Sequence, residues 1–229
     1  MEVRVLCFLL FVGSMAKEDM ERKVFIFPRQ SISDYVELTP QLTEPLDKLT
    51  VCLRTYTDLS KSHALFSLDL PESWDRHMFD IFQAPIDYTR PTPFHAFFVY
   101  INNSLAYSNA QAEVLHWRHS CVTWDSDTGV LQLWVNGKVY PQRVLQKGSS
   151  IDLQKGISLG QMRRNYGTGW EPESSFQGEI SDVHMWNEVL PPETIRQVLI
   201  NNRYINGNVI SWRSLNYTLN GDVIVQPKV

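Results

Sequence analysis

Several features that would point to a particular class of protein are scarce or missing in these 229 residues. The chain has only three cysteines and no cluster of lysine and arginine, and its net charge is −4. It contains no low-complexity linker, heptad pattern or internal repeat. The acidic balance and the lack of a basic cluster exclude nucleic acid as an expected partner. No segment approaches the roughly 20 apolar residues of a transmembrane helix, so membrane insertion is not expected.

Signatures of catalysis are also missing. There is no G-x-S-x-G, H-E-x-x-H or phosphate-cradling glycine loop. Sandwich glycosidases need paired carboxylates, and the nearest candidates are Glu179 and Asp182. The positions that would have to complete an alternating acidic face are Ser181 and Val183. We therefore expect no enzyme.

The N-terminus is typical of a secreted protein. Arg4 precedes the apolar run Val5–Val12 and the small-residue site Ser14–Ala16. This pattern predicts a signal peptide over residues 1–16 and one mature domain over residues 17–229. We expect an extracellular location.

Removal of the signal peptide leaves two of the three cysteines. Cys7 leaves with the peptide, whereas Cys52 and Cys121 remain. In an oxidising compartment they are expected to form one bridge, worth about 4 kcal/mol in the chain-entropy model. Two buried free thiols are the alternative.

Short apolar segments separated by proline, glycine and asparagine predict an all-β fold. The expected strands are rich in β-branched and aromatic residues: Val24–Phe27, Leu49–Tyr56, Phe94–Ile101, Val130–Val135 and Val223–Val225. Asn136-Gly137 follows the alternating residues of the fourth segment and predicts a type I′ hairpin. One short helix is expected after Pro191-Pro192, with Ile195, Val198 and Leu199 facing the core.

The segment His119–Ser126 reads H-S-C-V-T-W-D-S. It matches the pentraxin signature of histidine, any residue, cysteine, any residue, serine or threonine, tryptophan, any residue, serine or threonine. Further segments resemble the same family: Phe25–Pro28, Thr50–Leu53, Leu133–Lys138, Leu159–Gln161, Gly178–Ile180 and Met185–Trp186. The resemblance covers nearly all of the mature chain, except for divergence at about residues 70–111.

This resemblance implies a two-sheet, flattened jelly-roll (concanavalin-like) sandwich with one short helix and a Cys52–Cys121 bridge. It also implies assembly into a cyclic oligomer, commonly of five subunits, and calcium-dependent ligand binding on one face. It assigns His119 no catalytic role, so we expect a hydrogen-bonded structural histidine. His116 and His119 form an H-x-x-H pair, but a zinc site normally needs further nearby ligands.

The calcium site implied by the resemblance is changed in this chain. The acidic loop of the family corresponds to Met162, Arg163 and Arg164. Asp75 and Glu171 match two of the remaining metal ligands. Calcium needs six to eight oxygen ligands, and arginines in place of carboxylates oppose the ion. Calcium binding is therefore expected to be weak or absent.

Two interpretations of Arg163 and Arg164 remain open. They are either solvated loop residues that pair with Glu171, Glu173 or Asp75, or they bind an anion directly in place of the metal. The second interpretation predicts anionic or phosphorylated small ligands or surfaces as partners.

An alternative from another class is a monomeric laminin-G-like or lectin-like adhesion module, which would share the sandwich but form no ring. Native mass distinguishes the two. Sequons at Asn102 and Asn216 are candidates for glycosylation in a secreted chain.

Overall fold

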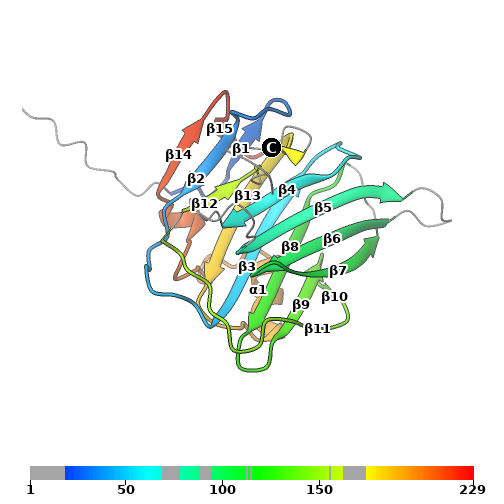
Figure 1. Cartoon of the computed structure of the whole chain (residues 1–229). Helices are drawn as coiled ribbons and strands as arrows, with labels where there is room; N and C mark the ends of the chain where they lie inside the picture. Colours follow the sequence, from blue (N-terminus) through cyan, green and yellow to red (C-terminus); the bar gives the residue numbers. More distant parts are fainter. Residues whose placement is uncertain are drawn as a thin grey trace, which may run out of the picture.

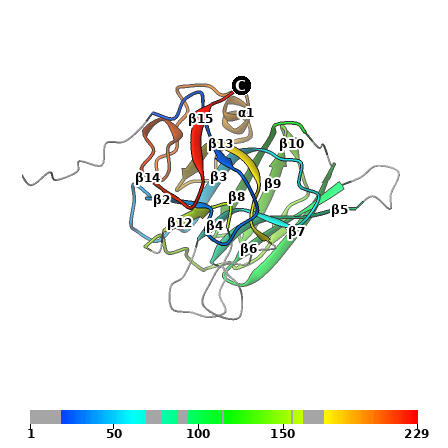
Figure 2. The same cartoon turned by 90° about the horizontal axis from the view of Figure 1, so that it is seen from above.

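The computed structural model describes residues 19–68, 78–87, 94–111, 113, 115–154, 156–161 and 174–229. The predicted signal peptide lies outside the described residues. What is described forms two antiparallel sheets packed face to face (Figures 1 and 2). The predicted all-β sandwich is therefore confirmed.

One sheet has eight strands. In spatial order they are β10 (Lys138–Val139), β9 (Val130–Val135), β8 (Arg118–Asp125), β3 (Lys48–Tyr56), β13 (Gly178–Trp186), β1 (Lys23–Phe27) and β15 (Ile224–Pro227), with β11 (Arg143–Val144) also paired to β9. The predicted C-terminal strand Val223–Val225 thus begins one residue later and continues to Pro227.

The other sheet has seven strands. They are β14 (Tyr217–Asn220), β2 (Tyr35–Leu38), β12 (Ile157–Leu159), β4 (His63–Leu68), β5 (Phe79–Asp87), β6 (Phe94–Ile101) and β7 (Ser104–Gln111). Three more of the predicted strands correspond to β1, β3 and β6 within one residue at each end, and Val130–Val135 is β9.

Alternation along the strands directs one set of side chains between the sheets. In β8, Val122 and Trp124 belong to this inner core, together with Leu131 and Leu133 of β9. Phe25 packs edge-on against Trp212, with 5.2 Å between ring centroids. Such geometry is favoured by the ring quadrupoles, so the layer is both apolar and specifically packed.

Two tight turns use asparagine or glycine at positive φ. Asn136 (φ 47°) and Gly137 (φ 77°) join β9 to β10, which confirms the predicted type I′ hairpin. Asn102 (φ 43°) and Asn103 (φ 68°) join β6 to β7 in the same way. This second hairpin was not predicted.

Helix α1 (Pro192–Leu199) lies on the outer side of the eight-stranded sheet (Figure 2). Ile195 and Val198 are buried, as predicted, whereas Leu199 is only half-buried. Ile195 and Val198 belong to a second apolar cluster together with Cys52, Cys121, Trp134, Trp186 and Leu190. A short 3₁₀ helix, η2 (Trp212–Ser214), was not anticipated. None of the helices in the described part of the chain has the length and apolar character needed to cross a membrane.

Candidate functional site

The loop that the sequence analysis connects with ligand binding begins after β12. Gly160 has φ +82°, and a side chain there would overlap the ring of Phe27. The Phe176 N–H donates to the Gly160 carbonyl at 2.8 Å. This hydrogen bond joins the two ends of the segment, so its base is closed.

The connection between β1 and β2 holds the same base. Gln161 is fully buried, and its amide nitrogen donates to the carbonyls of Ser31 and Asp34. On the other side of the loop, the Ser31 N–H donates to the hydroxyl of Ser175 at 2.9 Å. Gln30 donates to the Ser175 carbonyl at 2.9 Å. Both ends of the loop are therefore fixed to one scaffold.

The residues predicted for metal and anion binding cannot be placed. Asp75, Arg163, Arg164 and Glu171 all fall outside the described residues. The predicted sequons can be located: Asn102 and Asn216 are both half-buried, and the Asn102 amide donates to the Ser150 carbonyl at 3.2 Å.

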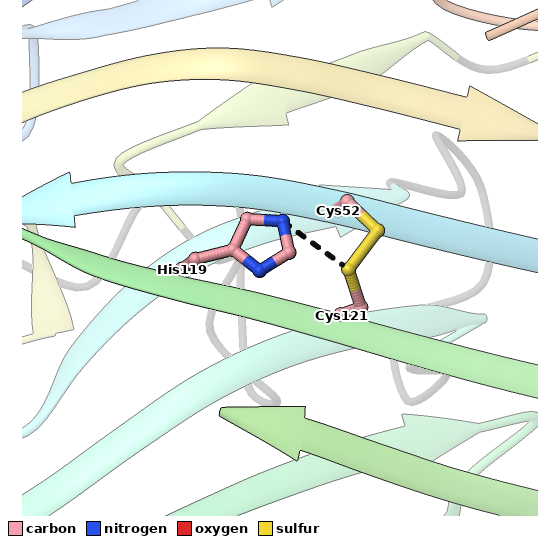
Figure 3. Close-up of side chains that lie close together, drawn as sticks. All are labelled: Cys52, His119 and Cys121. Atoms are coloured by element: carbon pink, nitrogen blue, oxygen red, sulfur yellow. Dashed lines mark hydrogen bonds between the residues drawn. A yellow bond between two sulfur atoms is a disulfide. The ribbon is translucent and has the colours of Figure 1, made fainter. Parts of the chain in front are cut away.

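The disulfide is present. Cys52 of β3 and Cys121 of β8 are register partners and are bonded to each other (Figure 3). Free buried thiols, the alternative considered from the sequence, are therefore wrong for this structure. The bridge joins neighbouring strands beneath α1.

His119 lies beside this bridge. Its Nε2 is 3.5 Å from the Cys121 sulfur, and its Nδ1 has no hydrogen-bond partner (Figure 3). Burial, reinforced by the charge of Arg54, lowers the pKa of His119 to about 3. The side chain is thus neutral and buried. The sequence predicted a hydrogen-bonded structural histidine; among the described residues, the hydrogen bond of its ring is this weak contact with the Cys121 sulfur.

Within the described residues, one group brings three metal-ligating side chains together: Cys52, His119 and Cys121. Its sulfurs are bonded to each other and are not thiolates, which zinc requires. Calcium prefers oxygen ligands, and this group offers none. At the loop base, the Gln161 Oε1 is a buried oxygen without a hydrogen-bond partner. One such atom does not make a calcium site, so the described residues do not fit the ion.

The structure also contains a buried polar group that the sequence analysis did not predict. Arg118 of β8 points between the sheets, where one guanidinium nitrogen donates to Gln83 Oε1 of β5 at 2.7 Å. The Gln83 amide nitrogen donates to Nδ1 of His95 on β6 at 2.8 Å. Gln83, His95 and Arg118 are all buried.

The sequence did contain a signal for this group. His95 shares the inward register of Phe97, Val99 and Ile101, and it is the polar exception in that series. Next to the group is a depression lined by Thr55, Thr57, Leu59, His95, Glu113, His116 and Arg118. The H-x-x-H pair is therefore divided: exposed His116 lines this depression, whereas His119 lies at the disulfide.

Comparison with known proteins agrees with the fold. The profile of the Pentaxin family matches residues 23–227. The chain is 42% identical to the C-reactive protein of Xenopus laevis, covering 100% of this chain and 92% of the relative. It is 36% identical to the serum amyloid P-component of Cavia porcellus, covering 97% and 95% of the two chains.

A solved structure shares the architecture. The heptameric SAP-like pentraxin of Limulus polyphemus superposes with a TM-score of 0.77 at 24% identity, covering 91% of this chain and 96% of that chain. The family profile and the two relatives each extend over nearly the whole sandwich. This chain belongs to the pentaxin family.

Proposed function

We propose that this pentaxin-type ligand-binding protein is a secreted recognition protein that binds anionic or phosphorylated ligands with little or no dependence on calcium. It would do so as a ring, through the loop of residues 162–173, and without catalysis. The proposal rests on a loop whose base is held in place but whose expected acidic residues are replaced by arginines. The loop base is fixed by Gln161 and Ser175, while the loop itself carries Arg163 and Arg164.

The charge change supports direct anion binding. Arginine presents a planar fork of donors that suits phosphate and carboxylate groups. The same two residues would repel a calcium ion and supply it with no oxygen. Glu171 and Asp75 remain as possible calcium ligands, but we expect any calcium binding to be weak.

Assembly and location are also part of the proposal. The Limulus protein is heptameric, which supports a closed ring for this chain. We infer five subunits, the number that the family resemblance implies. Secretion is inferred from the apolar N-terminal segment and is consistent with the Cys52–Cys121 bridge. A monomeric adhesion module remains the alternative for the same fold.

The ligand proposal can be tested by calorimetric titration of phosphocholine and phosphoethanolamine into the full-length secreted protein, with calcium and with chelator. Arg163→Ala with Arg164→Ala should weaken binding by a few kcal/mol, since charge-assisted contacts contribute about 1.5–3 kcal/mol each. Chelator should change nothing. Arg196→Ala with Arg203→Ala is the matched control, because it removes the same charge from two exposed positions.

Two results would contradict the proposal. If chelator abolishes binding, or if low-millimolar calcium raises the melting temperature, the loop retains a calcium mechanism. If native mass shows only monomers at micromolar concentration, the ring is wrong and the adhesion module is favoured.

A further inference from the structure

Along β8, the layer between the sheets changes from apolar to polar. Val122 and Trp124 contribute to the apolar core, but Arg118, on the same inner side of the strand, is only 4% exposed. A guanidinium is a permanent charge, and burying it is costly unless an opposite charge lies beside it. The surroundings of Arg118 therefore require an explanation.

The hydrogen bonds of Arg118 go to neutral groups. Its two terminal nitrogens donate to Gln83 Oε1 at 2.7 Å and to the Glu113 main-chain carbonyl at 2.8 Å. Its Nε, also buried, has no hydrogen-bond partner. The nearby carboxylate of Glu113 instead accepts a hydrogen bond from Asn136 at 3.1 Å.

The charge of Arg118 is only partly compensated by the described residues: burial lowers the pKa of its guanidinium, and the nearby Glu113 carboxylate offsets part of this effect. None of the ion pairs among those residues includes Arg118. The two histidines nearest this end, His63 and His95, are buried and bring no negative charge. Burial, with a further contribution from Arg118, lowers the pKa of His63 to about 4 and of His95 to about 3.

The buried group borders a depression of the surface. Arg118 and His95 form the inner part of the depression, and Thr55 and Thr57 line it from β3 and the residue that follows β3. Glu113 and His116 are exposed at its rim. The depression as described has no room for a water molecule, so an ion would reach Arg118 only if these rim side chains turned outward.

We propose that this depression is a binding site for a small oxyanion, a carboxylate or phosphate group, that pairs with the buried guanidinium of Arg118. The unpartnered Nε–H provides a donor, and the ion would bring a negative charge into direct contact with the guanidinium, which the Glu113 carboxylate does not make. Thr55 and His116 are placed to contact the outer oxygens. The inference rests on Arg118 and the described residues around it and not on the arginines of residues 162–173, so it does not depend on the function proposed above.

The test uses the full-length protein in its native assembly, with phosphate, acetate or chloride at constant ionic strength. We expect saturable binding of phosphate or acetate by calorimetry and a rise in melting temperature that chloride does not reproduce. Stronger binding of acetate identifies a carboxylate as the natural group, and stronger binding of phosphate identifies a phosphate. If neither binds, the proposal is wrong.

Variants locate the effect. Arg118→Met should abolish binding, and Arg118→Lys, which keeps the charge but removes the Nε–H and the fork, should weaken it at least about tenfold. The conservative variant keeps the test decisive if the first does not fold. Arg196→Met is the control for loss of one exposed cation and should bind phosphate as the parent does. Each Arg118 change is also made together with Arg163→Met and Arg164→Met, where the loop arginines no longer contribute and the remaining phosphate binding should depend on Arg118.

A second measurement reports on the site directly. An oxyanion next to Arg118 should raise the pKa of His95, as followed by NMR titration, whereas chloride should not. Native mass recorded on the same samples separates loss of binding from loss of assembly. If both Arg118 variants bind as tightly as the parent while the loop variant does not, the ion belongs to the loop and the inference is overturned.

Discussion

The two ends of strand β8 differ in how they pack against the seven-stranded sheet: one end packs through apolar side chains and the other through polar ones. At one end, Trp124 is enclosed by apolar side chains; at the other, Arg118 crosses to Gln83 and leaves a buried nitrogen without a partner. Tight apolar packing stabilises a fold, whereas buried polar groups cost stability unless they are satisfied. The apolar end therefore accounts for stability, and the polar end is where a binding role is worth testing.

The largest effect should come from the apolar end. Trp124→Ala would leave a cavity and remove the hydrogen bond that the indole donates to the Leu145 carbonyl at 3.2 Å. We expect a loss of about 3–5 kcal/mol in the free energy of unfolding, measured by guanidinium denaturation. Trp117→Ala, at a half-buried position beside Tyr56, is the matched control and should cost clearly less. Equal losses would contradict the assignment of the core.

The outer face of the same strand offers the next test. Replacing Cys52 and Cys121 with alanine should lower stability by about 2–5 kcal/mol, because the bridge restricts the unfolded chain. The native protein should show no thiol that reacts with Ellman's reagent. Two reactive thiols, or unchanged stability in the double variant, would refute this prediction.

The polar end should make stability depend on pH. An unfolded histidine binds a proton below about pH 6.5, whereas folded His63 and His95 do so only near pH 4 and pH 3. The unfolded state therefore binds more protons in this window, and stability falls as pH is lowered from about 6.5 to 4. Each histidine should contribute about 1.4 kcal/mol per pH unit.

His95→Gln isolates one of these contributions, because glutamine can still accept the hydrogen bond from Gln83. The variant should lose part of the slope between pH 6.5 and 4 and remain close to the parent at pH 7.5. Buried His119 and His184, on the other side of the sheet, account for part of the remaining slope. A slope identical to that of the parent would show that His95 is not buried as described.

The smallest effect concerns two serines on the inner side of β8 and just beyond it. Ser120 is buried and its hydroxyl has no hydrogen-bond partner, whereas the Ser126 hydroxyl donates to the Ser149 carbonyl at 2.5 Å. Ser120→Ala should be neutral or stabilising by up to about 1 kcal/mol, because it removes an unsatisfied polar atom. Ser126→Ala, the matched control, should cost about 1 kcal/mol. The opposite order would contradict the proposed division between the two ends.

Much of the fold could be predicted from local patterns. Alternation in Val130–Val135 and the following Asn136-Gly137 predict a hairpin because side-chain period and turn geometry are local properties. Pro191-Pro192, where α1 begins, is also a local signal, because proline suits the first turn of a helix. The β6–β7 hairpin was missed because Asn102-Asn103 was considered only as a sequon, although both residues adopt positive φ.

The polar group could not be predicted in the same way. Arg118, Gln83 and His95 come from three strands in two different sheets, and their contacts depend on how the sheets are placed over each other. A single sequence shows each as an isolated polar residue. Only His95 carried a local signal, since it interrupts an apolar register. The loop arginines, by contrast, were recognised through a motif, and their function remains to be tested.

The turn at Asn136 has a consequence for the ageing of purified samples. Asparagine followed by glycine is prone to lose its amide, because the unhindered glycine N–H can attack the side chain. Here that amide accepts a hydrogen bond from the His119 N–H at 2.8 Å and donates one to the Glu113 carboxylate at 3.1 Å. Deamidation would keep the first contact but set two carboxylates against each other at the edge of the Arg118 depression. Stored preparations would then become chemically mixed at this turn, and the Asn136→Ala variant should lack the acidic species that deamidation there produces on ion exchange.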